Sequence, residues 1–465
     1  MYQEPINIKA HLISEGERIP IDSKYASKYS LLIRFLNGKH FSHGTEFAKL
    51  LIQNKGENVE LGPCRFLSET DINGYTGRLI FFNEVYDLES LLFKNKLVKL
   101  QNAFLNLPLV LAHKNDIKQS FKNYTANLSY DLSVYKNVFD RLDSEYQEEP
   151  ENVKNEVQAA IIETEGKKFM RYLDDKIEEF NYFGDDFSED EHKRHGFYFR
   201  KQLWNYISIS PFMARTNLKP RGYAGDSEMM RMIYLNDYQG DSTFAKLMHK
   251  HPIEHPAAQA VRSRRYFITE ALRNFEKYDP ISPNENIKIL SVACGPVFEM
   301  MDILLSPEDC KRYHFTLLDQ DREALLEATQ VVDKIEKQLE TKICAVFLNE
   351  SVRTMLATPQ LKKKWGQFNF IYSMGLFDYL TPPVATGVIE KLYQLLKPGG
   401  EMVVGNFHVS NPSKWYMEYW LDWVLYHRTE AEFINLLKDS PSAKVSVSFE
   451  NTGSQMFLHV KKPRE

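Results

Sequence analysis

The strongest constraint on the fold is an alternation of short apolar runs and amphipathic helical stretches in residues 276–465. Helical segments such as DREALLEATQVVDKIEKQL lie between runs that are typical of buried strands. The strand runs are IKILSVA (287–293), HFTLLD (314–319), ICAVFL (343–348), FNFIYS (368–373) and GEMVVGNF (400–407). This alternation predicts a parallel sheet with helices on both faces, because parallel strands need long crossover connections.

The end of this region departs from the parallel pattern. KVSVSFE (444–450) and QMFLHVK (455–461) are strand runs, and the turn Asn451-Thr452-Gly453 joins them. Two strands joined by a tight turn are antiparallel. We therefore predict an α/β domain whose parallel sheet is closed by an antiparallel C-terminal hairpin.

Two other regions precede this domain. Residues 1–95 contain apolar runs such as YSLLIRF and GRLIFF, with the turn signals Asn37-Gly38 and Asn73-Gly74. Asn-Gly between apolar runs favours hairpins, and this predicts a small β domain, either a barrel or a sandwich. Residues 96–275 carry apolar residues at i, i+3 and i+4 spacing, which predicts a helical region that caps the α/β domain.

Composition narrows the function classes. Of the 465 residues, 43% are hydrophobic and 26% charged, which is the balance of a folded globular protein. The formal net charge is −5, so the chain as a whole lacks the positive electrostatic field that attracts nucleic acid. No apolar run approaches the ~18–20 residues of a membrane span, and the first residues lack a secretory signal. Four scattered cysteines indicate neither a disulfide framework nor a zinc site. We expect a soluble, cytoplasmic protein.

Small and polar residues follow the predicted strands, at the edge where open α/β sheets bind ligands. The first strand leads into Ala293-Cys294-Gly295-Pro296, where small residues let the backbone turn tightly and approach a ligand. The second ends in Asp319-Gln320, where an acid can accept hydrogen bonds from ribose hydroxyls. The third leads into Asn349-Glu350-Ser351-Val352, a polar step able to hydrogen-bond an adenine edge. The fourth ends in Ser373-Met374-Gly375.

Taken in order, these features resemble the class I S-adenosylmethionine-dependent methyltransferases. The terminal hairpin matches that family's reversed seventh strand, and LLKPGG before the fifth strand is one of its common signatures. The resemblance implies a Rossmann-like methyltransferase domain over residues 276–465, with S-adenosyl-L-methionine as the cofactor. A nicotinamide cofactor does not fit, since no GxGxxG follows the first strand.

The first strand departs from the family pattern, which often reads acid-x-Gly-x-Gly-x-Gly. Here Ser291 replaces the acid, Ala293 the first glycine and Val297 the third. Glu299 is a candidate for the missing carboxylate. The alternative is that Glu299 only starts the next helix and interacts with its dipole. Ser351 is preferred to Asn349 at the adenine. The cofactor-binding residues that the resemblance implies are Ala293, Cys294, Gly295, Glu299, Asp319, Gln320, Ser351, Val352, Ser373 and Met374.

A compact loop, Lys219-Pro220-Arg221-Gly222-Tyr223-Ala224-Gly225-Asp226, lies upstream between helical stretches. Arg221 could bind the cofactor's carboxylate with both ends of its guanidinium, while Tyr223 closes over the cofactor. An interdomain turn held by an Arg–Asp pair is the alternative. We favour the clamp, because methyltransferases commonly fold an N-terminal segment across the cofactor.

The sequence favours a small-molecule acceptor. The Asp/Asn-Pro-Pro-aromatic motif of methyltransferases that modify nucleic-acid amino groups is absent after the fourth strand. A carboxylate acceptor is already ionised at neutral pH and needs no base. His408, after the fifth strand, is a candidate base or carboxylate-orienting donor, and a structural histidine is the alternative. Trp415, Trp420 and Trp423 follow on one predicted helix, either as core or, with Phe377, as walls of an apolar acceptor pocket.

Longer segments resemble a bacterial family of multidomain methyltransferases that includes the extracellular-factor 3-hydroxypalmitic acid methyl ester synthases. These segments include SPFMARTNLKPRGYAGDSEMMRMIY, HKHPIEHPAAQAVRSRR and GNFHVSNPSKWYMEYWLDW. The resemblance covers most of residues 210–435 and implies O-methylation of a fatty or hydroxy-fatty acid carboxylate. The alternatives are a regulatory or scaffold protein that binds S-adenosylmethionine, and a methyltransferase of another small-molecule hydroxyl or amine. The expected partner is an acyl substrate, and a homodimer is left open.

Three further features are open to two interpretations each. The N-terminal strands are similar to a PilZ-like barrel, but Lys24 and Lys28 are only a near match to its cyclic-di-GMP motif, so a structural or dimerising role is favoured. His249, His251 and His255 could suggest a metal, but Pro252 and Pro256 are expected to break the helix that would align them. The run at Arg262, Arg264 and Arg265 predicts a solvated helix face or ion-pair partners.

Overall fold

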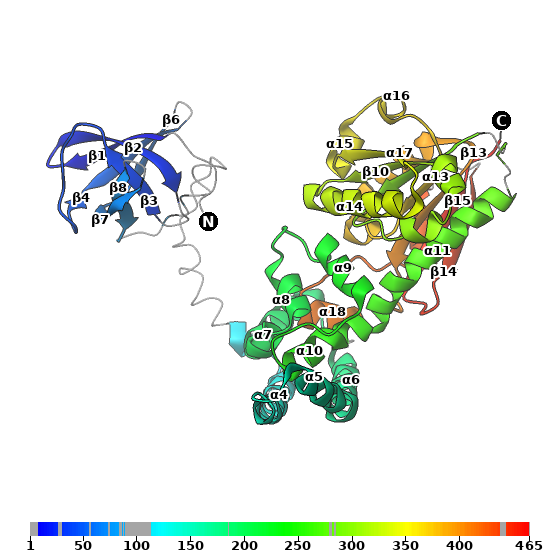
Figure 1. The fold of residues 1–465 in the computed structure, drawn as a ribbon, viewed down its shortest axis with the longest axis horizontal. Helices are drawn as coiled ribbons and strands as arrows, with labels where there is room; N and C mark the ends of the chain where they lie inside the picture. Colours follow the sequence, from blue (N-terminus) through cyan, green and yellow to red (C-terminus); the bar gives the residue numbers. More distant parts are fainter. Residues whose placement is uncertain are drawn as a thin grey trace. The chain divides into compact units, whose positions relative to one another are not determined.

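The computed structural model divides into two compact units, Met1–Asp116 and Ile117–Glu465, and each is described by itself (Figure 1). The structure describes residues 8–26, 30–54, 57–72, 75–82, 86, 88, 113–184, 186–278, 281–282, 285–437 and 443–464. The predicted boundary at residue 95, the turn at Asn73-Gly74, Lys28 and the side chain of Lys24 lie outside these described residues.

The N-terminal unit is an antiparallel β sheet. Its strands are β1 (Ile8–Ser14), β2 (Glu17–Ala26), β3 (Ser30–Phe35), β4 (Glu46–Phe47), β5 (Lys49–Asn54), β6 (Glu57–Leu61), β7 (Cys64–Ile72) and β8 (Tyr75–Phe81). They lie in the order β4-β7-β8-β3-β2-β1-β5-β6, and neighbours run antiparallel. Side chains on alternate positions, such as Leu12, Ile21 and Leu31, share one core. The predicted β domain is confirmed.

The second unit begins with a helical region, as the periodicity predicted. Its helices are α4 (Gln119–Glu145), α5 (Glu151–Ile161), the π-helical turn η2 (Ile162–Gly166), α6 (Lys167–Gly184), α7 (Glu189–Ile207), α8 (Pro211–Leu218), α9 (Ser227–Leu235), α10 (Thr243–Glu254) and α11 (Pro256–Tyr278). A short 3₁₀ turn, η1 (His113–Asp116), precedes them. On α6 the buried residues Phe169, Leu173, Ile177 and Phe180 recur once per turn, so one face of the helix enters an aromatic core.

The rest of this unit is a seven-stranded sheet with helices on both faces. Its strands are β9 (Ile287–Val292), β10 (Tyr313–Asp319), β11 (Cys344–Asn349), β12 (Phe368–Ser373), β13 (Leu396–Phe407), β14 (Lys444–Phe449) and β15 (Gln455–Lys461). Its helical elements are α12 (Met300–Ile303), α13 (Pro307–Arg312), α14 (Arg322–Leu339), α15 (Val352–Ala357), α16 (Leu361–Trp365), η3 (Phe377–Tyr379), α17 (Pro382–Leu395), α18 (Lys414–Trp420), α19 (Glu430–Ile434) and η4 (Asn435–Leu437).

The sheet order is β11-β10-β9-β12-β13-β15-β14. The first five strands are parallel, and β15 is antiparallel to both β13 and β14. The chain moves outward from β9 in one direction and then returns to β12 on its other side, so the strand order switches between β9 and β12. The predicted parallel sheet with an antiparallel terminal hairpin is confirmed, and its switch point is where such sheets bind ligands.

Two apolar layers cover the sheet. Residues of α11 and α14, such as Ile268, Phe275 and Val332, pack against one face. Residues of α17 and η4, such as Ile389 and Leu436, pack against the other. Because α11 also packs in the helical region through Ala257 and Val261, this long helix joins the two parts of the unit (Figure 1).

The aromatic segment after β13 completes the core of the helical region. Tyr416, Tyr419 and Trp420 of α18 lie in the same buried cluster as Phe180 and Phe199. The helix ends at Trp420, so Trp423 lies beyond it and the prediction of one helix for all three tryptophans is wrong. The sequence left two interpretations for these tryptophans, core or pocket wall, and Trp420 lies in the core.

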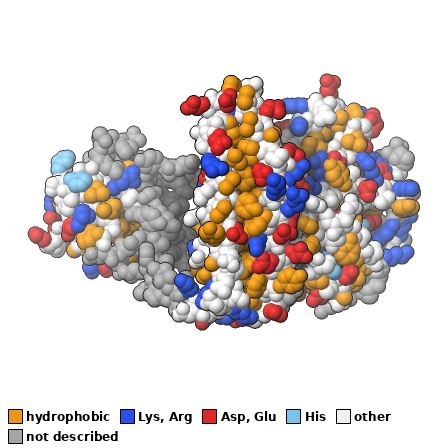
Figure 2. Space-filling view, turned by 90° about the horizontal axis from the view of Figure 1, so that it is seen from below, with side chains coloured by type: hydrophobic (Ala, Val, Ile, Leu, Met, Phe, Trp, Pro, Cys, Tyr) orange, Lys and Arg blue, Asp and Glu red, His pale blue; other side chains and the backbone are white. Residues whose placement is uncertain are grey.

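The surface of the helical region keeps some apolar side chains uncovered. Tyr130, Val134 and Val138 recur on one side of α4 and are 71%, 45% and 42% exposed. Figure 2 shows a band of hydrophobic side chains, flanked by charged ones, on the face of the molecule seen from below. Among the described helices, none has the length and apolar character needed to cross a membrane.

Candidate functional site

The floor of the site is the loop after β9, residues 293–299, which we call the floor loop. Its backbone has positive φ at Ala293 (52°), Gly295 (56°) and Val297 (49°). Glycine adopts this region freely, whereas a β-branched residue there is a rare exception. These are the three positions at which the family pattern has glycine. The chain therefore keeps a glycine-type backbone with other residues at two of them. A Cβ added to Gly295 would meet nothing within 4 Å, so the space above this turn is open.

Asp319 lies at the end of β10, next to the floor loop. Its Oδ2 accepts a hydrogen bond from the backbone N–H of Gly295 (3.0 Å), and its Oδ1 accepts one from the N–H of Asp321 (2.9 Å). The side chain is buried, and burial raises its pKa. A carboxylate oxygen has two lone pairs, so each oxygen keeps one acceptor position for a ligand.

Three of the polar residues at neighbouring strand ends brace the site rather than face it. Asn349 Nδ2 donates to the carbonyls of Asp319 (3.1 Å) and Gln320 (3.0 Å). Ser351 caps α15, where its Oγ accepts from the N–H of Thr354 (3.2 Å). Ser373 Oγ donates to the carbonyl of Val292 (2.8 Å), which ties the ends of β12 and β9 together.

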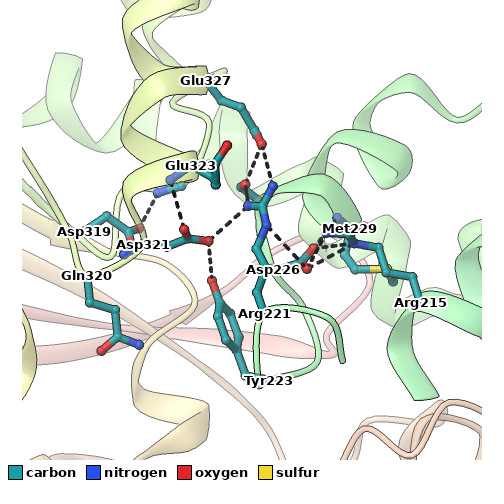
Figure 3. Close-up of polar contacts among 12 residues, drawn as sticks. Arg215, Arg221, Tyr223, Asp226, Met229, Asp319, Gln320, Asp321, Glu323 and Glu327 are labelled. Carbon is teal, nitrogen blue, oxygen red and sulfur yellow. Dashed lines mark hydrogen bonds and ion pairs between the residues drawn. The ribbon is translucent and has the colours of Figure 1, made fainter. Parts of the chain in front are cut away.

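The loop between α8 and α9, residues 219–226, bounds the other side of the site, and we call it the roof loop. Arg221 Nη1 lies 3.0 Å from Asp321 Oδ2, and its Nη2 lies 3.2 Å from Glu327 Oε1 (Figure 3). The hydroxyl of Tyr223 donates to the same Asp321 oxygen (3.4 Å). Arg221 and Tyr223 thus reach the α/β domain, where the guanidinium is engaged by carboxylates of the protein.

The roof loop is fixed at its second half as well. Arg215 pairs with Asp226 through two nitrogens, at 2.9 and 2.7 Å, and Asp226 caps α9 at the N–H of Met229 (Figure 3). The hydroxyl of Tyr379 donates to the carbonyl of Ala224 (2.8 Å). Gly225 has φ +76°, and a Cβ there would lie 2.5 Å from the Tyr379 hydroxyl and closer still to the ring of Trp423. Only glycine fits this position.

A cavity of about 300 Å³ lies between the floor loop, the roof loop and the ends of β9, β10 and β12. The predicted residues that line it are Tyr223, Ala293, Cys294, Gly295, Glu299, Asp319, Gln320, Val352 and Met374. Those that are not among its lining residues are Arg221, Ser351, Ser373 and His408.

His408 has both ring nitrogens engaged outside this cavity. Its Nδ1 lies 2.7 Å from Ser410 Oγ, and its Nε2 lies 3.2 Å from Glu430 Oε2. Phe377, Trp415 and Trp420, the proposed walls of an acceptor pocket, are also not among the lining residues, whereas Trp423 is. The role of His408 as base or carboxylate-orienting donor stays a prediction.

Two buried acids line the cavity near the end of β12. Glu299 Oε1 accepts a hydrogen bond from the hydroxyl of Tyr372 (2.7 Å), and burial raises the pKa of Glu299. Asp378 Oδ1 accepts from the N–H of Phe407 (2.6 Å), and burial raises the pKa of Asp378 to about 6. A ligand with a positively charged group would stabilise the ionised form of both.

One cation shares the cavity with these acids. Arg264 of α11 is 7% exposed and lines the cavity. The prediction of a solvated helix face or ion pairs for Arg262, Arg264 and Arg265 is wrong for Arg264, which is buried and makes no ion pair with any described residue. A signal for its burial was available. Ala257, Val261, Ile268 and Leu272 mark the buried face of α11, and Arg264 stands on that face. Asp378 was also missed, and its position between Phe377 and Tyr379 carries no comparable signal.

A second, smaller cavity of about 20 Å³ shares Val261, Phe407 and Trp423 with the first. Its other walls are largely apolar, and the lining residues with polar groups include His255, Ser413 and Tyr416. His255 Nδ1 lies 2.5 Å from Ser413 Oγ, and burial lowers the pKa of His255 to about 3. The imidazole is therefore neutral at physiological pH, and its Nδ1 shares a hydrogen bond with the serine hydroxyl.

The two other histidines of the predicted cluster, His249 and His251, lie in the helical core. Pro252 lies inside α10 and does not break it, so His249 and His251 belong to one helix, contrary to the expectation for Pro252. The expected break occurs at Pro256, because α10 ends at Glu254 and α11 begins at Pro256. His251 lies 2.7 Å from the Tyr416 hydroxyl through Nδ1 and 3.0 Å from Asp174 through Nε2. Within the described ranges, no group of three or more His, Cys, Asp or Glu side chains is arranged to hold a metal ion.

No protein-family model matches the sequence, and the search of curated proteins gives no match. Among solved structures, a possible exported protein from Bordetella parapertussis is 18% identical over 56% of this chain and 86% of that chain, with a TM-score of 0.43. Magnesium protoporphyrin IX methyltransferase from Synechocystis PCC 6803 with bound SAM is 10% identical over 44% and 83%, with a TM-score of 0.32. The N-methyltransferase NodS from Bradyrhizobium japonicum WM9, in complex with S-adenosylhomocysteine, is 14% identical over 45% and 90%, with a TM-score of 0.31. At these identities and TM-scores, the likenesses carry no argument about function.

Proposed function

We propose that this chain is an S-adenosylmethionine-dependent methyltransferase. The observation that carries the proposal is the cavity at the switch point of the sheet, where the backbone N–H groups of Gly295 and Asp321 hold the carboxylate of Asp319. A carboxylate fixed in this way accepts hydrogen bonds from two neighbouring hydroxyls, such as those of a ribose.

The cavity fits the rest of such a cofactor. Gly295 leaves open space above the floor loop, where an amino-acid end can approach the backbone. Val352 and Leu318 offer apolar surface and Glu350 offers an acceptor beside Asp319, which suits an adenine ring. Glu299 supplies a buried carboxylate for an ammonium group in place of the acid that Ser291 replaces.

S-adenosylmethionine supplies a methyl group on a positively charged sulfur when it is bound. The residues of this chain orient the reactants and exclude water, which together account for much of the rate of such a displacement. The roof loop closes one side of the cavity through Tyr223 and Gly225. Asp319, Glu299 and Asp378 provide negative charge for a cationic ligand, and burial strengthens that attraction.

We further propose that the acceptor is the carboxylate of a largely apolar molecule, of the fatty or hydroxy-fatty acid class. The apolar side of the larger cavity supports this, because Val261, Phe407 and Trp423 line it between the helical region and the segment around α18. An alkyl chain there would contribute ~0.8 kcal/mol per buried methylene. A carboxylate acceptor needs no base, which agrees with the position of His408 away from the cavity.

The remaining proposals concern organisation. We propose a cytoplasmic enzyme with three parts: a β domain (1–95), a helical cap (96–275) and the methyltransferase domain (276–465). For the β domain we propose a structural or dimerising role. A scaffold protein that binds S-adenosylmethionine without turnover is the competing function, and so is methylation of another small-molecule hydroxyl or amine.

Calorimetric titration with S-adenosylhomocysteine tests the cofactor site. Asp319→Asn keeps the size of the side chain but replaces one acceptor oxygen by a donor, and we expect affinity to fall roughly 5- to 100-fold, equivalent to about 1–3 kcal/mol. Asp333→Asn is the matched control, since Asp333 lies on the exposed side of α14. Equal affinity of both variants would show that Asp319 does not hold the ribose.

Turnover tests the acceptor. Labelled S-adenosylmethionine is incubated with fatty and hydroxy-fatty acids of increasing chain length, and methyl esters are measured by mass spectrometry. We expect the KM of the acid to fall with chain length until the pocket ends. Binding of the cofactor without methylation of any acid, phenol or amine would favour the scaffold function instead.

A further inference from the structure

Arg264 is a buried guanidinium that has no carboxylate partner among the residues that the structure describes. Its Nη1 donates to the carbonyl of Met374 (3.2 Å), and its Nη2 lies 3.2 Å from the sulfur of Met230. The hydroxyl of Tyr234 is its third polar neighbour, and its Nε has no hydrogen-bond partner. A thioether is a weak acceptor, so one carbonyl and one hydroxyl are the better partners of five N–H donors.

The neighbouring arginines of α11 are paired in the ordinary way. Arg265 holds Asp302 with two nitrogens, one of them at 2.8 Å, and Arg262 lies 3.5 Å from Glu254. In the roof loop, Arg221 is likewise paired with two carboxylates. Across the part of the chain that the structure describes, no acidic oxygen lies within 4 Å of Arg264. Buried charges in proteins are normally paired, so this one indicates that a ligand supplies the counter-charge.

The position of Arg264 defines what that ligand can be. The guanidinium lies beside Gly375 at the end of β12, where a Cβ would come to 3.4 Å from both terminal nitrogens. Glu299 and Asp378 also line this cavity, and each acts on Arg264 electrostatically without contacting it. A phosphate dianion would be repelled by these acids and by Asp319. A ligand with one carboxylate in or beside a positively charged group fits this cavity. The carboxylate would pair with Arg264, and the positive group would be attracted by the acids.

Resting on the proposed function, we propose that Arg264 binds a carboxylate in the cavity and thereby positions a reactant at the end of β12. Two sources have this chemistry: the amino-acid end of the cofactor, and an acid acceptor. In the first case Arg264 and Glu299 form opposite-charged partners for the carboxylate and the ammonium group. In the second case Arg264 fixes the acid oxygen that receives the methyl group. In the first case Arg264 has the role that the sequence predicted for Arg221.

The experiment uses the full chain and Arg264→Met, which removes the charge but keeps an apolar stem of similar length. Arg262→Met is the matched control on the same helix. Calorimetry measures binding of S-adenosylhomocysteine and of its decarboxylated analogue. If Arg264 binds the cofactor, Arg264→Met should lose 10- to 100-fold in affinity for S-adenosylhomocysteine and little for the analogue.

If Arg264 binds the acceptor, both cofactor affinities should stay within twofold of wild type, and hexadecanoate or a 3-hydroxyhexadecanoate should show at least a 10-fold higher Kd. Arg264→Lys should restore part of either loss. The melting temperature of the ligand-free protein separates a binding role from a structural one. We expect it to stay equal or rise in Arg264→Met, because an unpaired buried charge has been removed.

A fall of several degrees in that melting temperature, or unchanged affinity for the cofactor and for the acids, would overturn the inference while leaving the proposed function intact. Wild-type protein that does not bind S-adenosylhomocysteine at all would overturn both. The Asp319 and Arg264 variants therefore report on the two proposals separately.

Discussion

The floor loop and the roof loop bound the same cavity, but different forces hold them. In the floor loop, the N–H of Gly295 donates to Asp319 and the N–H of Cys294 donates to the carbonyl of Leu318 (3.0 Å). In the roof loop, side chains make the decisive contacts: Arg221 pairs with Asp321 and Glu327, and Lys219 pairs with Asp422 (2.6 Å). A loop held by its backbone tolerates new side chains as long as the φ values are kept. A loop held by ion pairs depends on the identity of each partner.

A substitution that disturbs the steric fit of the roof loop should have the largest effect on the free energy of unfolding. Gly225→Ala places a Cβ against Trp423 and Tyr379 at a positive φ, and we expect a loss of about 2–5 kcal/mol in the free energy of unfolding. Gly222→Ala is the matched control, since Gly222 has φ +88° but open space around a Cβ. It should cost about 1 kcal/mol. Chemical denaturation of the full chain measures both, and equal losses would mean that the roof loop can move away from Trp423.

Ionisation of Asp378, a residue of the cavity wall outside both loops, should give the second-largest effect on stability. Its folded-state pKa of about 6 lies above the usual value of 3.8, so the folded protein holds this proton more tightly than the unfolded chain. Stability from this group is present below about pH 4 and is lost as the pH rises through 6. From pH 4 to pH 7, wild type should therefore lose about 2 kcal/mol of stability relative to Asp378→Asn. A constant difference between the two proteins across this range would contradict the raised pKa.

Charge in the roof loop should have a smaller, salt-dependent effect. Arg221→Gln leaves Asp321 and Glu327 without their cation, and we expect it to weaken binding of S-adenosylhomocysteine by about 1–2 kcal/mol at low salt. At 1 M salt part of this loss should be recovered, because screening reduces the repulsion between the acids. Arg231→Gln removes a single pair with Glu228 and is the control. A loss that does not change with salt would indicate a direct contact between Arg221 and the ligand.

Relief of backbone strain in the floor loop should have the smallest effect on stability, and it should stabilise the protein instead of destabilising it. Ala293 has φ 52° and is only partly buried, so Ala293→Gly should relieve strain and stabilise the protein by about 0.5–1 kcal/mol. The expected rise in melting temperature is of the order of a few degrees at most. A lower melting temperature would mean that the methyl group of Ala293 contributes more through packing than its backbone conformation costs.

The sheet could be predicted because its strands are apolar runs, and such a run indicates a buried strand from the local sequence alone. The end of β10 at Asp319 and the turn at Gly295 followed from the same pattern. The beginning of β13 did not: Phe368 pairs with Leu396, so all of the LLKPGG segment after Leu395 belongs to the strand instead of preceding it. Proline and glycine are tolerated there because the register shifts between Phe368 and Phe370.

The partners of the charged residues could not be predicted in the same way. The motif around Arg221 predicted a clamp on the cofactor, with an interdomain turn held by an Arg–Asp pair as the alternative. The carboxylates that Arg221 contacts, those of Asp321 and Glu327, lie about a hundred residues later in the chain. The aromatic stripe of α18 predicted burial but gave no information on which core it enters. Arg264 stands on an apolar helix face, and only the fold shows that a cavity meets that face.

The insertion of α18 into the helical region has a consequence for the order in which the chain is made. The helical region leaves the ribosome well before residues 414–420 are synthesised, so Phe180 and Phe199 lack their contacts with Tyr419 during that interval. The roof loop likewise precedes Asp321 and Glu327. We expect a chain that stalls before α18 to expose this aromatic surface and to be held by chaperones or degraded. Release of a stable protein would then require that synthesis has passed α18.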